Sequence, residues 1–260
     1  MSAAGSAAPV VSADAAAYTL RLADDALVGA QRMGEWIAAA PQLEEDVALA
    51  NIALDLLGQA RALLSHAGAL EGRGRDEDAL AYFRDEREFS NVQVFELDNG
   101  DFGFTMARLL VTSTYQHALY TALTGSVDET LAAIAAKAVK EVDYHRDHAA
   151  MWVLRLGDGT AESHRRVQQG LDDLWPYVAE LFETDDLARR VAAAGIGVDP
   201  ATLEGPVVDQ VASVLDRATL TMPGAGVRHT GGRRGVHTER FGYLLAELQH
   251  IARSHPGASW

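Results

Sequence analysis

Apolar residues recur every three or four positions along most of this chain, which is the spacing of one face of an α-helix. The pattern predicts four long helices, at about 14–40, 43–70, 102–123 and 128–156. Ile37 falls on the apolar face of the first, and Asp128 can cap the fourth. Shorter helices are predicted further along, at about 160–182, 185–194, 200–217 and 236–254. Stretches of alternating β-branched residues, the pattern of strands, are scarce. We therefore expect an all-α protein.

The connections between the long helices predict how they are arranged. A short break around Pro41 joins the first two, and a turn at Gly125 joins the last two. Helices joined so closely pack as antiparallel neighbours. A polar crossover over 75–101, with one short helix at about 79–88, links the two hairpins. Two helical hairpins joined by a long crossover form the ferritin-like topology.

This topology leads us to expect one ferritin-like domain. Its core bundle covers about 14–157 and a C-terminal helical extension covers about 158–260, while 1–13 form a flexible tail. The tail lacks the basic start and long apolar middle of a secretory signal. No stretch is apolar enough, by its sequence, to span a bilayer. We therefore expect a cytoplasmic protein.

Charge and cysteine content exclude several kinds of partner and site. The chain of 260 residues has a formal net charge of −15. That charge argues against nucleic acid and anionic membrane as partners, because both attract cationic faces. The chain has no cysteine. This excludes disulfides, thiolate metal sites and a cysteine nucleophile.

The inner faces of the four long helices have the spacing of a metal site but lack most of its ligands. Di-iron bundles take one carboxylate from the first helix of each hairpin and Glu-x-x-His from the second. Residues three apart share a helical face, so both side chains of that motif point inward. Counting back from His145 by three and then twenty-nine positions, and from Gln59 by three and then thirty, gives the equivalent set: Ala26, Leu56, Gln59, Ser113, Val142 and His145.

Only His145 in this set is a usual iron ligand, and one imidazole cannot neutralise an iron pair. We therefore predict that this chain has no metal, no bound cofactor and no catalytic residue. On this interpretation His145 and His117 are hydrogen-bonded core residues. The fold of an oxygenase would then be retained for a role other than oxygen chemistry.

Asp55 and Glu141 each lie one position before an empty ligand position. They are open to three interpretations: remnants of an outer ligand shell, partners of Arg32 or Arg61, or ligands. The third interpretation is a rescued metal site of Asp55, Glu141 and His145. It requires shifted registers on two helices at once.

Two features near the C-terminus suggest other contacts. The glycine-rich segment 223–235 contains Arg233 and Arg234, a pair able to bind a phosphate or carboxylate group or to dock on an acidic partner. The literal Glu-x-x-His motif in the chain is Glu247–His250. It lacks a partner carboxylate from another helix, so we interpret both residues as surface or interface groups.

Four stretches resemble the non-catalytic, ferritin-like subunit of bacterial phenylacetyl-CoA epoxidase complexes. They are residues 33–61, 83–91, 136–145 and 230–249, and the chain ends in a matching Pro256-Gly257 and Trp260. The resemblance covers about 18–260, with a slight departure at Met33. These stretches are long and specific, well beyond a shared fold.

The resemblance implies that a sister subunit of the same fold carries the di-iron site and epoxidises the aromatic ring of phenylacetyl-CoA. A reductase with flavin and an iron–sulfur cluster would supply electrons from NADPH. This chain would bind the catalytic subunit in a hetero-oligomer, and we expect a large apolar interface on the first and second helices. Two alternatives stay open: a metalloenzyme using Glu141, His145 and Asp55, and a subunit that docks CoA or the reductase through Arg233 and Arg234.

Overall fold

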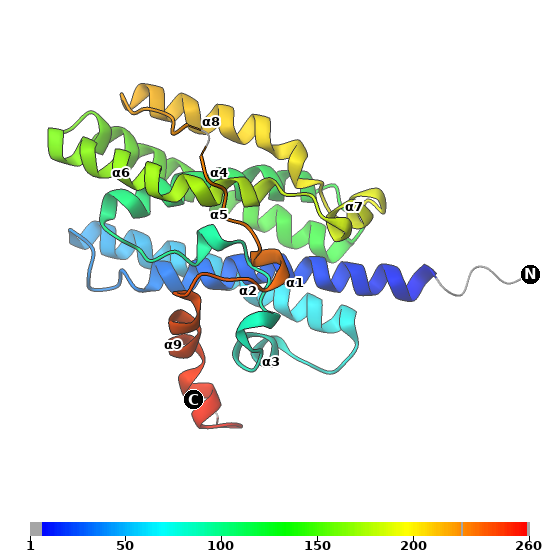
Figure 1. Cartoon of the computed structure of the whole chain (residues 1–260). Coiled ribbons are helices and arrows are strands. Elements are labelled where there is room, and N and C mark those ends of the chain that lie inside the picture. The colour runs from blue at the N-terminus through cyan, green and yellow to red at the C-terminus, as the bar shows by residue number, and fades with distance from the viewer. Residues whose placement is uncertain (1–6, 225, 259–260) are drawn as a thin grey trace, which may run out of the picture.

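The computed structural model describes residues 7–224 and 226–258, and all regular structure within them is helical (Figure 1). The long helices are α1 (Ala7–Gly34), α2 (Leu43–Glu71), α4 (Phe102–Leu123) and α5 (Glu129–Gly157). α1 packs along α2, α4 packs along α5, and α2 also contacts α5. The two predicted hairpins and the crossover between them are therefore confirmed.

Local side-chain chemistry explains where these helices begin and end. The Asp128 carboxylate accepts a hydrogen bond of 3.0 Å from the Leu131 N–H and caps α5, as predicted. Asp101 caps α4 in the same way through the Phe104 N–H, at 2.9 Å. Gly72 ends α2 in the left-handed conformation, with φ 65°, which glycine adopts without strain.

The ends of α1 differ from the prediction. The helix begins at Ala7, so residues 7–13 are helical rather than part of a tail, and residues 1–6 lie outside the described residues. Alanine-rich sequence favours this extension because alanine has the highest helix propensity. The helix ends at Gly34, and the chain then turns before Pro41, with Ala38 at a positive φ of 65°. Ile37, which we expected on the buried face, is 58% exposed.

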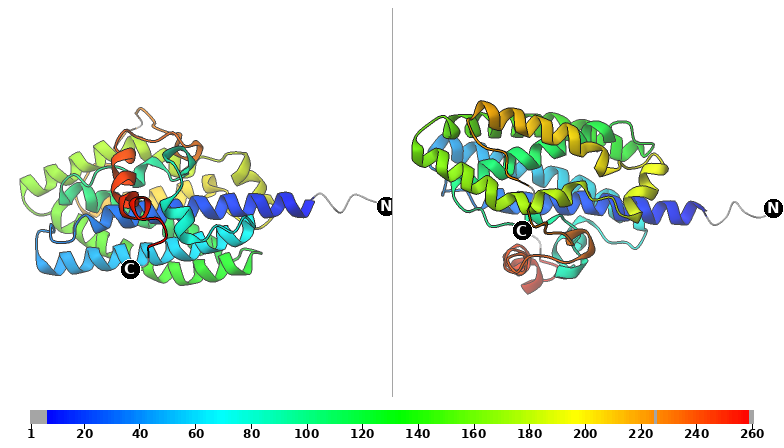
Figure 2. Two further views of the ribbon diagram at one scale, coloured as in Figure 1. Left: turned by 90° about the horizontal axis from the view of Figure 1, so that it is seen from below. Right: turned by 45° about the horizontal axis from the view of Figure 1, so that its top comes forward.

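The crossover and the C-terminal extension supply the remaining elements. The crossover holds α3 (Glu77–Tyr82) and the short 3-10 turns η1 (Glu86–Glu88) and η2 (Gln93–Phe95). The extension holds α6 (Ala161–Val178), η3 (Ala179–Phe182), α7 (Asp186–Ala193), η4 (Pro200–Leu203), α8 (Glu204–Arg217), η5 (Gly232–Arg234) and α9 (Phe241–Ser254). α6 and α8 cover α4 and α5, whereas α9 packs against α3 and η1 away from them (Figure 2).

Helix α2 is more apolar than the sequence pattern indicated. By length and composition it meets the criteria for a membrane span, with a mean hydropathy of 1.4 over its best window. In the structure it is a core helix of the bundle, packed against α1 and α5. Only 44% of that window is buried, so much of its apolar surface faces outward.

Candidate functional site

The six positions that correspond to di-iron ligands all lie inside the bundle. Each is at most 3% exposed, and together they come from α1, α2, α4 and α5: Ala26, Leu56, Gln59, Ser113, Val142 and His145. Three of these residues, Ala26, Leu56 and Val142, have hydrocarbon side chains without a donor atom. The Ser113 hydroxyl donates to the Leu109 carbonyl of its own helix at 2.5 Å. These side chains supply too few donors for an iron pair, so a di-iron cluster does not fit them.

His145 keeps the arrangement of a metal ligand without the metal's other ligands. Its Nε2 lies 3.0 Å from Asp55 Oδ2, and this partner assigns the ring proton to Nε2. Nδ1 is buried and has no hydrogen-bond partner among the described residues. Metal-binding histidines commonly donate their second N–H to a carboxylate in this way. Burial lowers the pKa of His145 although Asp55 opposes it, so the ring is neutral near pH 7.

The rescued site of Asp55, Glu141 and His145 is only partly assembled. Asp55 contacts His145, but Glu141 Oε2 accepts a hydrogen bond of 3.0 Å from Gln59 Nε2. Lys137 also lies 3.1 Å from Glu141. Within residues 7–224 and 226–258, no three His, Asp or Glu side chains are arranged to hold a metal ion.

The alternative in which Asp55 or Glu141 pairs with Arg32 or Arg61 is wrong. Arg32 binds the Glu96 carbonyl and lies 3.0 Å from Asp98, and Arg61 lies 2.7 Å from Glu77. These arginines are held by the crossover segment. They therefore do not reach the contact between α2 and α5.

Four polar pairs instead connect α2 with α5 or its cap, and we call them the seam ladder. Along α2 they are Glu45 with His148, Asp55 with His145, Gln59 with Glu141, and His66 with Asp128. The Glu45 carboxylate lies 3.0 Å from His148 Nε2 and accepts a hydrogen bond of 2.7 Å from Trp152 Nε1. The ladder joins the two hairpins, so the polar groups near the ligand positions hold helices together.

His117 was expected in the core, and this prediction is wrong. Its side chain is 26% exposed and lies 3.5 Å from Asp143 at the bundle surface. The helix that carries it, α4, is buried continuously from Thr105 to Gln116. Because so much of this helix is buried on every side, its apolar spacing did not identify the inward face.

The side chain of the proposed docking residue Arg233 points into the protein and binds groups there. Its guanidinium forms a paired contact with Asp25, at 2.7 Å and 3.1 Å, and donates to the Ser90 carbonyl at 2.9 Å. Its side chain is 13% exposed. Arg233 is therefore unavailable to an external anion, whereas Arg234 is exposed. Glu247 and His250 are also exposed, as expected for surface groups.

Arg233 is part of a buried ionic cluster that we call the clamp. Asp24 and Asp25 of α1 bind Arg84 and Arg233, respectively, and Glu96 binds His237 at 2.7 Å. Glu180 accepts hydrogen bonds from the backbone N–H groups of three residues: Gln93, Gly231 and Gly232. The clamp therefore ties the crossover and the C-terminal segment to α1.

Sequence reasoning missed most of the clamp. One signal was present, because Asp24 and Asp25 interrupt the apolar stripe of Ala23 and Ala26. Two adjacent acidic residues in a buried stripe require cationic partners. Which arginines supply them is not encoded locally, since the partners lie 60 and 208 positions away.

Comparison with known proteins identifies the family of this chain. The family model described as "Phenylacetic acid catabolic protein" matches residues 2–260. The chain belongs to this family. It is also 48% identical over 244 residues to one of the subunits of the 1,2-phenylacetyl-CoA epoxidase of Escherichia coli (strain K12). That alignment covers 94% of this chain and 98% of the relative. The helical bundle of this chain is ferritin-like, as it is in the phenylacetic acid catabolic proteins.

The stretches that resembled epoxidase subunits have clear structural roles in this member of the family. Residues 83–91 contain Arg84 and Ser90, and residues 230–249 contain Arg233 and His237, all of them in or beside the clamp. Residues 136–145 contain Glu141 and His145, two of the four residues on the α5 side of the seam ladder. These stretches therefore hold the fold together.

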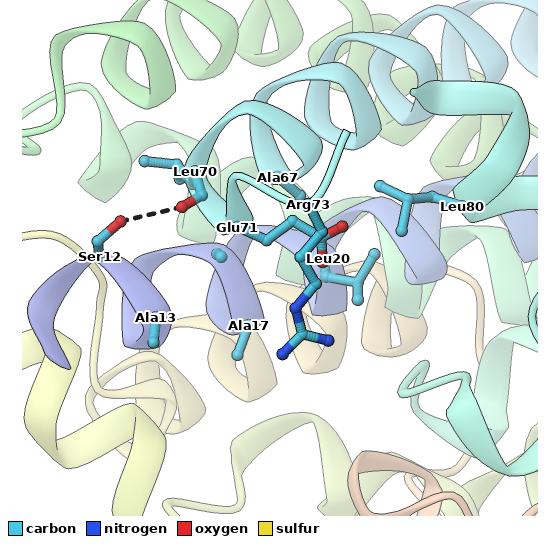
Figure 3. Close-up of a pocket in the computed structure, with 10 residues that line it drawn as sticks. Ser12, Ala13, Ala17, Leu20, Ala67, Leu70, Glu71, Arg73 and Leu80 are labelled. Atoms are coloured by element: carbon cyan, nitrogen blue, oxygen red, sulfur yellow. Dashed lines mark hydrogen bonds between the residues drawn. The ribbon is translucent and has the colours of Figure 1, made fainter. Parts of the chain in front are cut away.

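One surface pocket of this phenylacetic acid catabolic protein, of about 430 Å³, lies between the first half of α1 and the end of α2 (Figure 3). Alanine and leucine side chains form most of its wall, and Ser12 Oγ donates across it to the Leu70 carbonyl at 3.0 Å. Among the described residues that line it, the charged ones are Arg73 and Glu71, and Glu71 is paired with Arg75.

Proposed function

We propose that this chain is the structural, non-catalytic subunit of a phenylacetyl-CoA epoxidase of phenylacetate catabolism. It binds a catalytic subunit of the same fold, which carries the di-iron site. The observation that carries the proposal is that Ala26, Leu56 and Val142, the predicted positions of three carboxylate ligands, are buried hydrocarbon side chains. The chain itself holds no cofactor, and the complex works in the cytoplasm.

The physics of the bundle interior fits this division of labour. A di-iron site buries several carboxylates, and each needs the metal to offset its cost of desolvation. Here apolar side chains fill the equivalent space as ordinary core. Such a bundle is stable without iron and so provides a firm scaffold for a partner whose interior is committed to metal. Iron then belongs to the catalytic subunit, and flavin, an iron–sulfur cluster and NADPH belong to the reductase.

Arg233 argues against the alternative in which this subunit docks CoA or the reductase through its arginine pair. A guanidinium already paired with Asp25 gains little from a second anion, and releasing it would leave Asp25 unpaired. Arg234 is exposed, but a single solvated arginine is not the arginine pair on which this alternative rested.

The decisive experiment measures iron per chain and complex formation on the same preparation. The chain is purified alone from iron-replete cells for elemental analysis, and a second sample is co-expressed with a tagged catalytic subunit. We expect negligible iron in the chain alone and stoichiometric co-purification with the catalytic subunit. Iron approaching two atoms per chain would establish a metalloenzyme instead. Failure to co-purify would remove the role as a scaffold.

A further inference from the structure

Gly58 stands in the middle of α2 with no reason inside the chain to be glycine. A Cβ atom built at this position meets no atom of the described structure within 4 Å. Glycine is the least favourable residue in a helix interior after proline, because it costs the most backbone entropy. Gly68, further along the same helix, is different, since a Cβ there would collide with the Arg75 carbonyl at 2.2 Å. The absent side chain at Gly58 therefore points to something outside this chain.

The surface of α2 before Gly58 is apolar and outward-facing, and the exposed Arg61 follows one turn after the glycine. Val47 and Leu54 are 53% and 64% exposed, and Leu43 at the start of α2 is 75% exposed. Tyr144 on the neighbouring helix α5 is 50% exposed. The residues of α2 are spaced by four and seven positions, which places them on one face of the helix. We call Leu43, Val47, Leu54, Gly58 and Tyr144 the α2 face.

Both lysines of the sequence border this face. They are Lys137 and Lys140, and the other twenty basic residues counted with them are arginines. Both lie on α5 and are exposed. Lys137 contacts Glu141, which is bonded to Gln59 beside Gly58. A chain with a net charge of −15 thus carries Lys137 and Lys140 beside its most apolar exposed helix, in addition to Arg61 on that helix, which is paired with Glu77.

We propose that the α2 face is where the same-fold catalytic subunit packs, through a long helix whose backbone approaches Gly58. This inference rests on the proposed function. A convex ridge along a helix of 29 residues, about 43 Å long, suits another long helix rather than a small molecule or a loop. Small residues at a helix crossing let two backbones come close. Acidic side chains of the partner helix face Lys137 and Lys140 at the edge.

Substitution of Gly58 separates stability from binding. In Gly58→Ala the added methyl group meets open space, so we expect a higher melting temperature for the isolated chain. Gly58→Leu also folds but places a large side chain at the closest approach, and we expect affinity for the catalytic subunit to fall at least tenfold. Gly205→Leu on α8 is the matched control, because a Cβ there also meets nothing within 4 Å. It should bind like the wild type.

The lysines provide a second measurement that needs no substitution. Amine-reactive labelling followed by peptide mass spectrometry should modify Lys137 and Lys140 in the isolated chain and much less in the complex with the catalytic subunit. Equal labelling in both samples, together with wild-type affinity of Gly58→Leu, would overturn the α2 face. If Gly58→Leu dissociates a homodimer of this chain and leaves the mixed complex intact, the face belongs to a second copy and the proposal is wrong. If the wild-type chain fails to bind at all, the proposed function fails first.

Discussion

Asp25 and Arg233 lie 208 positions apart in the sequence and form a paired salt bridge inside the protein. The carboxylate of Asp25 also accepts the Val92 N–H at 2.9 Å, and Arg233 donates to the Ser90 carbonyl. One ion pair therefore joins α1, the crossover and the C-terminal segment. The fold closes through this contact as well as through the bundle core.

Removing Arg233 should destabilise the protein severely. Arg233→Ala leaves Asp25 as an uncompensated buried charge, and losing one partner of a buried pair costs about 3–5 kcal/mol. We expect that loss in the free energy of unfolding, measured by urea denaturation. Arg234→Ala, at the exposed neighbour, should change it by less than about 0.5 kcal/mol. A fully stable Arg233→Ala variant would show that the clamp does not support the fold.

His237 should make the protein less stable in alkali. Burial alone lowers the pKa of His237, but the hydrogen bond and charge of Glu96 outweigh it and raise the pKa above 6.5. The stabilising contribution is complete below pH 6.5 and is lost as the pH rises through the raised pKa. Urea midpoints should therefore fall above pH 6.5 in the wild type and fall less in His237→Gln. An identical slope in both proteins would contradict the assignment.

His145 should make the protein less stable in acid, the opposite of the effect of His237. Its pKa in the folded protein lies below 6.5, chiefly because of burial. The stabilisation is present above pH 6.5 and is lost as the pH falls through the lowered pKa. We expect His145→Gln to lose stability less steeply than the wild type between pH 6.5 and the acid transition. His250→Gln, at an exposed position, serves as the control and should follow the wild-type curve.

The register of the ligand positions can be tested by rebuilding half of a metal site. Combining S113E with V142E adds two carboxylates to the native imidazole of His145. If these positions converge, the variant should bind Co²⁺ and show the visible absorption bands of a protein-bound ion. The amide pair S113Q and V142Q keeps the side-chain size and should stay colourless. A folded S113E and V142E variant without cobalt bands would show that the three positions do not meet.

The helical architecture was predictable because its signals are local. The apolar period, the break at Pro41 and the cap at Asp128 each act over a few residues, and all three lie where the sequence indicated. The predicted end of the first helix, at about residue 40, lay beyond its actual end at Gly34, because the apolar residue Ile37 continued the helical pattern into a turn. Local pattern cannot tell an exposed apolar residue from a buried one.

The candidate site was less predictable because its contacts are distant in sequence. Asp55 and Glu141 were singled out from their positions beside empty ligand sites, and they do lie at the contact between α2 and α5. His145 had been grouped with them in the rescued-site alternative, whereas the pairing of Glu141 with Gln59 became evident only in three dimensions. Arg233 was misjudged because a glycine-rich loop usually lies in solvent, and most of this segment does. Gly231, Gly232 and Arg233 instead turn into the protein, where Glu180 and Asp25 bind them.

The late position of Arg233 in the sequence also affects how the protein is made. Asp25, Glu96 and Glu180 leave the ribosome well before their partners, which belong to residues 231–237 of a chain of 260. The helical hairpins form during synthesis, since domains fold from the N-terminus as the chain emerges. The contacts of Asp25, Glu96 and Glu180 with the C-terminal segment can therefore form only after residues 231–237 have emerged. A product of premature termination near residue 230 therefore keeps every bundle helix but leaves unpaired acids, which makes it a substrate for cellular proteases.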